Sequence, residues 1–341
     1  MTRIKNENEL TLCTQCILPD TFPGIKFNEQ GICKYCLQDD KKADKPKRKN
    51  EYKLKLDTLI RDTRDSASVY DVLMAYSGGK DSSYTLKILK ERYNLKILAL
   101  TFDNHFVSPS AIENINNVTD ALGIDSIIIR PPKNLVTELF ALTSKQDIFS
   151  KATLLRASSV CTSCIGLVKS LVLKTAIEMS VPLVAYGWSP GQAPIQSAIM
   201  KTNPSMMLQG QRALFNSYTG TLKDRLKQYV VPEHYFELYK DRFPTNIHPL
   251  AFFDYNEESI KKELVSIGWG NPKDTDTNSS NCLLNAYANY CHIDRHGFHP
   301  YVWEIANMVR QGIIERDEGI KKIYTEQDPK MVIYARERLG L

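Results

Sequence analysis

A short loop of small and charged residues carries the strongest chemical signal in this sequence. It spans residues 77–83 with the sequence SGGKDSS, between an apolar run typical of a buried strand and an amphipathic stretch typical of a helix. Two adjacent glycines let the backbone turn tightly and aim N–H groups at an anion. The helix N-terminus adds partial positive charge. The loop predicts a phosphate-binding site; a Gly-rich turn without a ligand is the alternative.

Four cysteines near the N-terminus indicate a metal site. Cys13 and Cys16 form one CxxC pair, Cys33 and Cys36 form a second, and sixteen residues separate the pairs. Four thiolates at this spacing are typical of a closed tetrahedral zinc site, which leaves no open position for catalysis. We therefore expect structural Zn²⁺, which supplies folding energy that a unit of ~40 residues lacks. Rubredoxin-like iron and uncoordinated thiols are the alternatives.

Three further cysteines lie far from the first four. Cys161 and Cys164 form a CxxC pair that we place on a loop before a helix, and Cys282 follows the polar run of residues 274–281. Three thiolates can hold a 4Fe–4S cluster with one iron open to a ligand. The pair could instead cycle through a disulfide or persulfide. A second zinc site, completed by Cys291 or His292, and plain buried thiols are the other interpretations.

Strands alternating with helices must position the loop. Short apolar runs predict strands over residues 69–76, 95–102, 124–130 and 181–186. Helical patterns fall at 52–64, 82–93, 108–122, 135–149, 165–179 and 257–268. This alternation predicts an α/β fold with a parallel sheet, whose carboxyl edge is where such sheets bind ligands. After Gly187 the alternation fades, so we expect helices and loops over 190–250 and a wholly helical region from 283.

These patterns divide the chain into five segments. The expected segments are a zinc-ribbon-like unit at 1–40, a basic linker and helix at 41–68, an ATP-binding core at 69–190, an insert covering the acceptor site at 191–282, and a helical C-terminal region at 283–341. The basic run within 41–55 is either a solvated linker or an arm that contacts phosphates.

Composition narrows the class of protein. The chain has 341 residues, of which 43% are hydrophobic and 24% charged, and its formal net charge is +5. Those fractions exclude disorder as the main state, and the charge is too small to indicate nucleic-acid binding by itself. We see no apolar run near the ~20 residues that cross a bilayer and no secretory signal, so we expect a cytoplasmic protein without a membrane span.

The loop resembles the SGGxDS signature of the PP-loop ATP pyrophosphatase superfamily and differs from a Walker A loop. The resemblance implies that the loop binds the pyrophosphate part of ATP, with Mg²⁺, and that the enzyme adenylates an acceptor oxygen before a nucleophile displaces AMP. It implies catalytic roles for Lys80, Asp81 and Ser82. It implies ATP contacts for Ser77, Gly78, Gly79, Asp81, Ser82, Ser83, Asp103 and Gly187. Where the superfamily commonly has GHxxDD, this chain has GWSPGQ from residue 187.

Two longer strings resemble the N-acetyl sugar amidotransferase family of bacterial surface polysaccharide (lipopolysaccharide) biosynthesis. They are CTQCILPDTFPGIKFNEQGICKYC from residue 13 and RHGFHPYVWEIANMVRQGIIERDEGI from residue 295. The likeness covers the cysteine unit, the core and the tail, and leaves residues 190–280 weakly matched. It implies a nucleotide- or lipid-linked N-acetyl sugar as the small-molecule acceptor, attacked by ammonia from a separate glutaminase subunit.

Two other functions stay open. The second cysteine group is similar to that of Fe–S-dependent PP-loop sulfur transferases, which implies thiolation of tRNA or a small molecule. A non-catalytic nucleotide-binding or zinc-ribbon adaptor is the third reading, and the intact loop argues against it.

Overall fold

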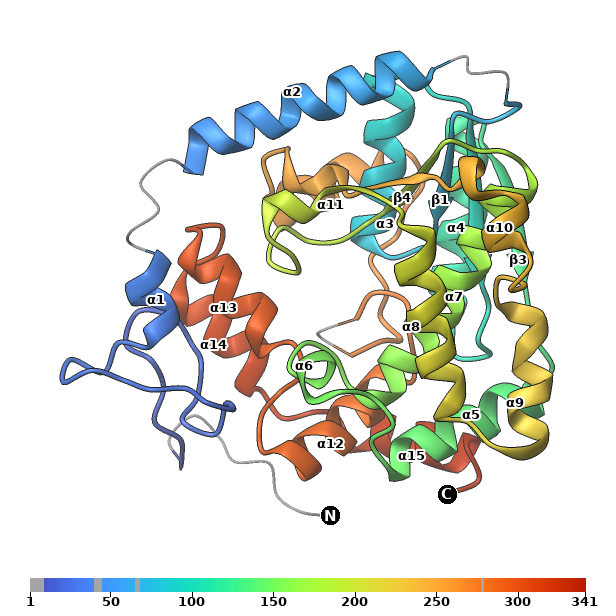
Figure 1. Cartoon of the computed structure of the whole chain (residues 1–341). Helices are drawn as coiled ribbons and strands as arrows, with labels where there is room; N and C mark the ends of the chain where they lie inside the picture. Colours follow the sequence, from blue (N-terminus) through green and yellow to red (C-terminus); the bar gives the residue numbers. More distant parts are fainter. Residues whose placement is uncertain (1–8, 40–44, 65–67, 277–278) are drawn as a thin grey trace.

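Six strands form a single sheet in the computed structural model, which describes residues 9–39, 45–64, 68–276 and 279–341 (Figure 1). The strands are β1 (Val72–Ala75), β2 (Ile97–Phe102), β3 (Asp125–Ile129), β4 (Leu183–Tyr186), β5 (Ile199–Lys201) and β6 (Thr245–Ile247). Their order is β3-β2-β1-β4-β6-β5, and every neighbouring pair is parallel except β5 and β6. The predicted α/β class, with an N-terminal four-cysteine unit and a helical C-terminal region, is confirmed.

Helices account for most of the remaining chain. The α-helices are α1 (Lys34–Asp39), α2 (Lys45–Thr63), α3 (Lys80–Lys87), α4 (Pro109–Leu122), α5 (Lys133–Lys145), α6 (Lys151–Leu154), α7 (Ser159–Glu178), α8 (Pro204–Asn216), α9 (Gly220–Leu226), α10 (Tyr235–Leu238), α11 (Glu257–Val265), α12 (Asn285–His296), α13 (Val302–Arg310), α14 (Arg316–Tyr324) and α15 (Pro329–Arg338). A π-helical turn, η2 (Ile88–Arg92), continues α3, and the 3-10 turns are η3 (Ile195–Ser197), η4 (Lys227–Tyr229), η5 (Lys240–Arg242) and η6 (Pro249–Ala251).

The two faces of the sheet build two separate cores, because successive strand residues point to opposite faces. Leu73 packs in one core with side chains of α5, α7, α12 and α15. Val72 and Met74 pack in the other with side chains of α2, α3, α4 and α11. The result is three layers, helices over both faces of a largely parallel sheet, which leaves the carboxyl edge of the strands for loops.

Local signals explain why some predicted boundaries hold. Helix α4 starts after Ser108, whose hydroxyl accepts a hydrogen bond from Ala111 N, and it ends at Gly123 with a φ of 58°. Serine is a preferred residue at a helix start, and glycine in the left-handed region is a preferred residue at a helix end. The sequence therefore predicts both ends of this helix.

The structure corrects the placement of the CxxC pair. We expected Cys161 and Cys164 on a loop before a helix, but both lie inside the first turns of α7. Ser158 caps that helix, since its hydroxyl accepts from Cys161 N at 3.1 Å. The cap moves the helix start six residues ahead of the predicted Ile165.

A second correction concerns residues 190–250, where we expected only helices and loops. This stretch contributes β6, which pairs in parallel with β4, and β5, which forms the antiparallel edge. Both strands have three residues. Strands this short leave too little apolar alternation to read from sequence.

The four-cysteine unit lies against the C-terminal helices α13 and α14 (Figure 1). Arg316 donates to the backbone carbonyls of Cys13 and Cys16 at 3.0 and 2.9 Å. The two segments that carry the amidotransferase resemblance therefore share one core, although about 260 residues separate them in the sequence.

Helix α7 has the length and composition of a membrane span, alone among helices of the described ranges. Our expectation that no apolar run approaches that length did not anticipate it. Its side chains Leu167, Leu171 and Val172 pack in the core beside the sheet, which is how the central helix of an α/β fold is covered. The cytoplasmic location stays a prediction.

Candidate active site

The glycine-rich loop leaves the carboxyl end of β1 and leads into α3 as predicted. Ser77 Oγ lies 3.0 Å from Ser82 Oγ and 3.4 Å from Gly79 N. Ser82 Oγ also donates to the carbonyl of Gly79 at 3.0 Å. The two hydroxyls therefore hold the loop in a closed turn at the N-terminus of α3.

Two glycines permit contacts that no side chain could make. Gly78 has a φ of 72°, and a Cβ there would lie 2.4 Å from the carbonyl oxygen of Ala111. Gly187, just after β4, would place a Cβ 2.5 Å from Ser82 Cα and 2.6 Å from Ser82 N. Strands β1 and β4 are neighbours whose connections leave in opposite directions, so this contact lies at the switch point where such sheets bind ligands.

Lys80 turns away from the loop into a charged cluster. Its Nζ lies 2.9 Å from Glu257 Oε1, 2.9 Å from the Tyr255 hydroxyl and 3.5 Å from Asp81. Burial favours the neutral amine, but the charges of Asp81 and Glu257 outweigh it and raise the pKa of Lys80. Burial likewise opposes ionisation of Glu257, yet Lys80 and Lys322 hold its pKa at about 2. Lys80 and Glu257 are therefore both charged at neutral pH.

Other predicted site residues have structural partners. Ser83 is buried behind the loop, with its hydroxyl 3.1 Å from that of Tyr76. Asp103 accepts from Arg130 Nε at 2.6 Å and from His105 N at 2.9 Å. These contacts organise the end of β2, and the predicted contact of each residue with ATP stays a prediction.

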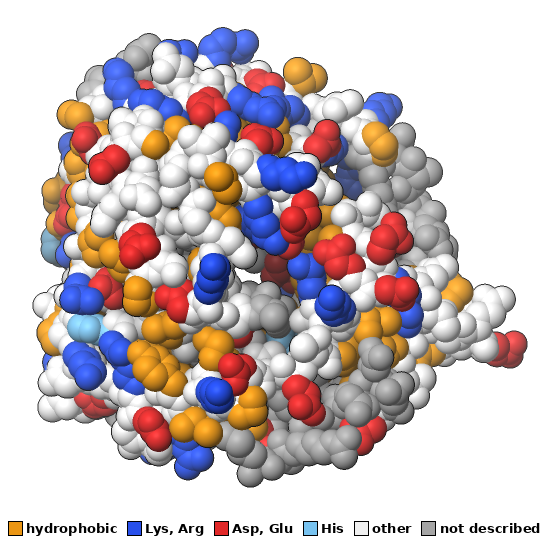
Figure 2. Space-filling model, turned by 180° about the vertical axis from the view of Figure 1, so that it is seen from behind, with side chains coloured by type: hydrophobic (Ala, Val, Ile, Leu, Met, Phe, Trp, Pro, Cys, Tyr) orange, Lys and Arg blue, Asp and Glu red, His pale blue; other side chains and the backbone are white. Residues whose placement is uncertain are grey.

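A distant segment covers the loop. Trp269 Nε1 donates to the carbonyl of Gly78 at 3.0 Å, and Lys80 N donates to Ser280 Oγ at 3.1 Å. Trp269 and Ser280 therefore lie against the loop, and the role of the 191–282 insert as a cover for the acceptor site stays a prediction. On the face seen in Figure 2, side chains of both charges surround a central hollow.

Glu304 on α13 brings a carboxyl group to the same edge. Its Oε1 accepts from Ser189 Oγ at 2.5 Å, in the loop that Gly187 begins. Burial raises the pKa of Glu304 to about 7, helped by the charge of Asp81 and opposed by the bond from Ser189. A carboxyl group with a pKa near neutrality beside a phosphate loop is suited to proton transfer.

Glu304→Gln should change the pH dependence of stability. Because the folded chain keeps the Glu304 proton up to about pH 7, while an unfolded glutamate loses it near ~4.3, the wild-type protein loses stability as the pH rises through that window. The variant lacks this loss. We expect the free energy of unfolding of the variant, relative to that of wild type, to rise by on the order of 2 kcal/mol between about pH 5 and pH 8. Urea unfolding at both pH values measures it. An advantage that is the same at both pH values would contradict the buried-acid assignment.

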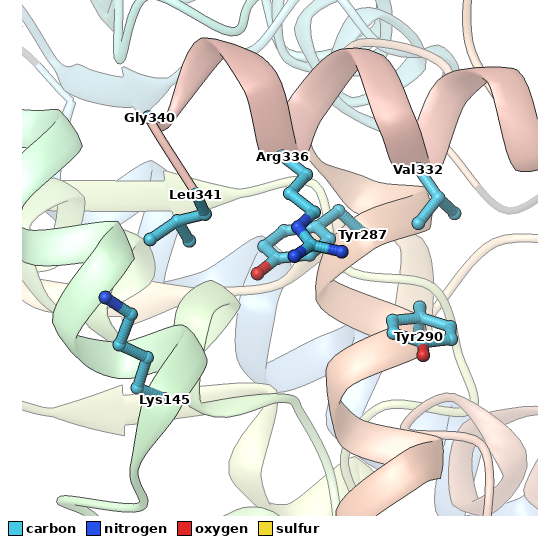
Figure 3. Close-up of a pocket in the computed structure, with 7 residues that line it drawn as sticks. All are labelled: Lys145, Tyr287, Tyr290, Val332, Arg336, Gly340 and Leu341. Carbon is cyan, nitrogen blue, oxygen red and sulfur yellow. The ribbon is translucent and has the colours of Figure 1, made fainter. Parts of the chain in front are cut away.

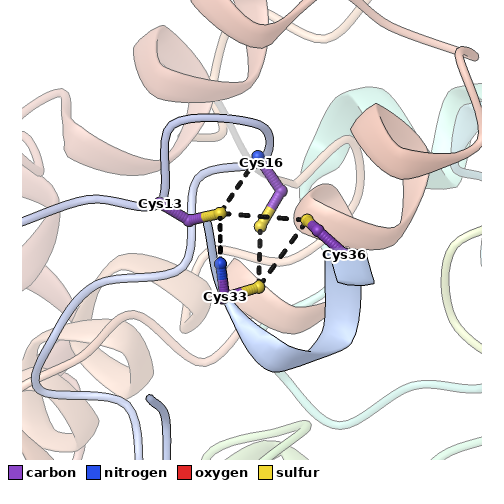
Figure 4. Close-up of side chains that lie close together, drawn as sticks. All are labelled: Cys13, Cys16, Cys33 and Cys36. Atoms are coloured by element: carbon purple, nitrogen blue, oxygen red, sulfur yellow. Dashed lines mark hydrogen bonds between the residues drawn. The ribbon is translucent and has the colours of Figure 1, made fainter. Parts of the chain in front are cut away.

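The four N-terminal cysteines meet in one buried group (Figure 4). Sγ atoms lie 3.8 Å apart for Cys13 and Cys36, 3.8 Å for Cys16 and Cys33, and 3.6 Å for Cys33 and Cys36. A tetrahedron with Zn–S bonds of ~2.3 Å has edges of about 3.8 Å. The donor set therefore fits a tetrahedral metal ion. Arg310 Nη1 lies 3.3 Å from Cys16 Sγ and adds an outer contact from α13.

The second cysteine group also converges. Cys164 Sγ accepts from Asn104 Nδ2 at 3.3 Å, just after β2, and Cys282 forms a β-bridge with Val107 in the same loop. Burial raises the pKa of Cys164 to about 12. Burial also raises the pKa of Cys282, and the charges of Cys164 and Cys161 raise it further. Within the described ranges only the first group brings its ligand atoms within 4.8 Å of one another, so the second is looser. Its three neighbouring thiols still suit an iron–sulfur cluster or another metal, whose charge would ionise them.

A separate pocket of about 370 Å³ lies between α5, α12 and α15 (Figure 3). Lys145, Tyr287, Tyr290 and Arg336 line it. None of these residues belongs to the loop, the charged cluster or the cysteine groups.

Sequence reasoning missed several residues at this edge, and their separation explains why. Tyr255 and Glu257 reach Lys80 across about 175 residues, and Ser280 reaches it across 200. No local pattern marks such contacts. Glu304 lies inside a string that resembles the amidotransferase family, and nothing in that string distinguishes it from the other acidic residues there.

Comparison with known proteins gives a distant relative and no family. No protein-family model matches the chain. An uncharacterised protein of Methanocaldococcus jannaschii is 24% identical over 330 residues, which cover 96% of this chain and 99% of that protein.

Solved structures match at low similarity. The U34-tRNA thiolase NcsA of Methanococcus maripaludis, solved with its [4Fe-4S] cluster, is 16% identical at a TM-score of 0.37, with 97% of this chain and 98% of that chain covered. The NH3-dependent NAD synthetase of Campylobacter jejuni is 13% identical at a TM-score of 0.31, covering 57% and 96%. A predicted subunit of tRNA methyltransferase from M. jannaschii is 18% identical at 0.29, covering 57% and 74%. TM-scores this low establish no relationship, so the fold assignment rests on the strand order and register.

Proposed function

We propose that this chain is an ATP-dependent enzyme of the PP-loop type, which transfers AMP to an oxygen of its acceptor and releases pyrophosphate. One observation carries the proposal: the loop that ends β1 is held closed by Ser77 and Ser82 and touched by Gly187 from β4, at the switch point of a parallel sheet. The positive end of the α3 dipole and the N–H groups of its first turn would stabilise charge on the leaving pyrophosphate.

Lys80 and Asp81 fit this chemistry in different ways. Asp81 lies at the first turn of α3, where its carboxylate could hold Mg²⁺ beside the phosphates. Lys80 bonds to Glu257 and Tyr255. The phosphates of ATP would compete with Glu257 for the ammonium group of Lys80. Lys80 would then exchange the carboxylate for a phosphate when ATP binds.

The nature of the products tests this proposal. We expect the protein to bind the non-hydrolysable analogue α,β-methylene-ATP and to convert α-labelled ATP to AMP in the presence of an acceptor. Binding by isothermal titration and thin-layer separation of the label would show both. Formation of ADP in place of AMP, or failure to bind the analogue, would reject the proposal.

For the second step we propose attack by ammonia on an adenylated N-acetyl sugar, with a separate glutaminase as the ammonia source. The support is that the two strings resembling the amidotransferase family pack together, through Arg316 on the carbonyls of Cys13 and Cys16. A structural zinc ion in that unit and a role in surface polysaccharide synthesis belong to the same proposal.

The second candidate is sulfur transfer to tRNA or a small molecule. The convergence of Cys161, Cys164 and Cys282 beside the β2 loop favours it. Anaerobic purification followed by iron, zinc and sulfide analysis separates the two candidates. Absorption near ~400 nm with labile sulfide favours sulfur transfer, whereas zinc alone favours the amidotransferase.

A further inference from the structure

Helix α7 carries a cation that has no acidic partner. Lys169 follows Cys164 by five residues and is partly buried, and no acidic side chain pairs with it within the described part of the chain. Its Nζ lies 4.6 Å from the centre of the Trp188 ring. Burial lowers the pKa of Lys169. A cation–π contact offsets only part of the cost of removing an ammonium group from water, so the site is electrostatically incomplete.

An aromatic stack continues from that cation. The ring centres of Trp188 and His248 are 4.0 Å apart with an angle of 18° between the planes, and Tyr186 stacks on His248 at 5.5 Å. His248 is 5% exposed and its Nδ1 has no hydrogen-bond partner. Burial lowers the pKa of His248 to about 3, so the ring is neutral and can donate or accept one further bond.

This group lies next to the phosphate loop. Trp188 directly follows Gly187, where an added Cβ would lie 2.5 Å from Ser82 Cα in α3. Helix α7 precedes β4 in the parallel sheet, so its N-terminal half lies at the same carboxyl edge as the loop. Lys169 lies at the middle of α7, about two turns from Cys161, and the contact of its Nζ with Trp188 places it beside the segment that follows β4.

We propose that Lys169, Trp188 and His248 form the subsite that binds a phosphate group and the adjoining sugar of a phosphorylated sugar acceptor. An ammonium group without a counter-ion and a neutral imidazole with a free nitrogen match an anion and a sugar hydroxyl group, and the indole contacts both side chains. The inference rests on the proposed function, because it supplies the acceptor whose oxygen would face the α-phosphate of ATP.

Acceptor-dependent protection of Lys169 is the primary test. The protein is saturated with α,β-methylene-ATP and labelled with trace acetic anhydride at pH 8, with and without UDP-N-acetylglucosamine. Mass spectrometry then measures the acetylation of each lysine. We expect protection of Lys169 and none of Lys174, a lysine on the same helix whose Nζ bonds to Gln228 O. Protection by tRNA alone, or by neither ligand, would overturn the proposal.

Matched variants provide the second test. Lys169→Met should weaken binding of UDP-N-acetylglucosamine about tenfold or more, since one charge-assisted contact is lost. Lys174→Met should bind it as wild type does. Equal affinity of Lys169→Met and wild type would overturn the subsite. Binding of α,β-methylene-ATP, measured on the same samples, reports the proposed function separately: its loss in wild type counts against the ATP site, and its retention with an unprotected Lys169 counts against the subsite alone.

Discussion

Cys13→Ser should remove the metal from the N-terminal unit and lower the stability of the whole chain. Cys13 Sγ lies 3.8 Å from Cys36 Sγ and accepts from Cys33 N at 3.2 Å, at the centre of a group that is fully buried. Because binding of a structural zinc ion supplies folding energy directly, we expect the melting temperature to fall by on the order of 10 °C and the zinc content to fall with it.

The effect should extend beyond the unit. Arg310 on α13 contacts Cys16 Sγ, and Arg316 on α14 bonds to the carbonyls of Cys13 and Cys16. Helix α13 also carries Glu304, which bonds to the loop after β4. Loss of the metal would therefore loosen a helix that bonds to the loop after β4. Since that loop begins at Gly187, which packs against Ser82, we expect weaker binding of α,β-methylene-ATP as well.

Cys291→Ser is the matched control for that substitution. Cys291 is partly buried on α12 and belongs to neither cysteine group. It should keep the metal content of wild type and lose little stability. Metal analysis and thermal unfolding of the two variants in parallel decide the assignment, and an unchanged melting temperature in Cys13→Ser would contradict it.

Much of the core could be predicted because its signals are local. The loop at 77–83 combines glycines, hydroxyls and a helix start within seven residues, and the strands beside it are apolar runs between breakers. The CxxC pairs are likewise local signals, because the two-residue spacing within each pair lets both thiolates bind one metal ion. At all these places the neighbouring residues decide the structure.

The rest depends on contacts that the order of residues does not show. Strand β6 forms only because β4 offers a free edge, and its three residues have no pattern of their own. The partners of Lys80 come from α11 and the segment before it, so no local pattern predicted its ion pair with Glu257. Tertiary electrostatics decides the position of a long charged side chain, and no local propensity encodes it.

Gly187→Ala should abolish nucleotide binding without unfolding the chain. A Cβ at this position would lie 2.5 Å from Ser82 Cα, 2.6 Å from Ser82 N and 2.9 Å from Asp81 C. All three are backbone atoms, so no rotamer change relieves the clash, and the start of α3 must move by about 1 Å relative to β4. A displacement of that size misaligns the N–H groups of the loop, and we expect turnover of ATP to fall about a hundredfold.

Gly210→Ala separates this steric effect from the general effect of replacing glycine. Gly210 lies in α8, and no atom would come within 4 Å of its new Cβ. An alanine inside a helix is more stable than glycine by roughly 0.5–1 kcal/mol, so this variant should melt slightly higher and bind α,β-methylene-ATP as wild type does. Calorimetric titration of α,β-methylene-ATP into both variants compares their affinities for the nucleotide. If Gly187→Ala binds the analogue with wild-type affinity, the contact between the segment after β4 and the loop is not part of the nucleotide site. ATP would then not bind at the switch point between β1 and β4, which contradicts the proposed function.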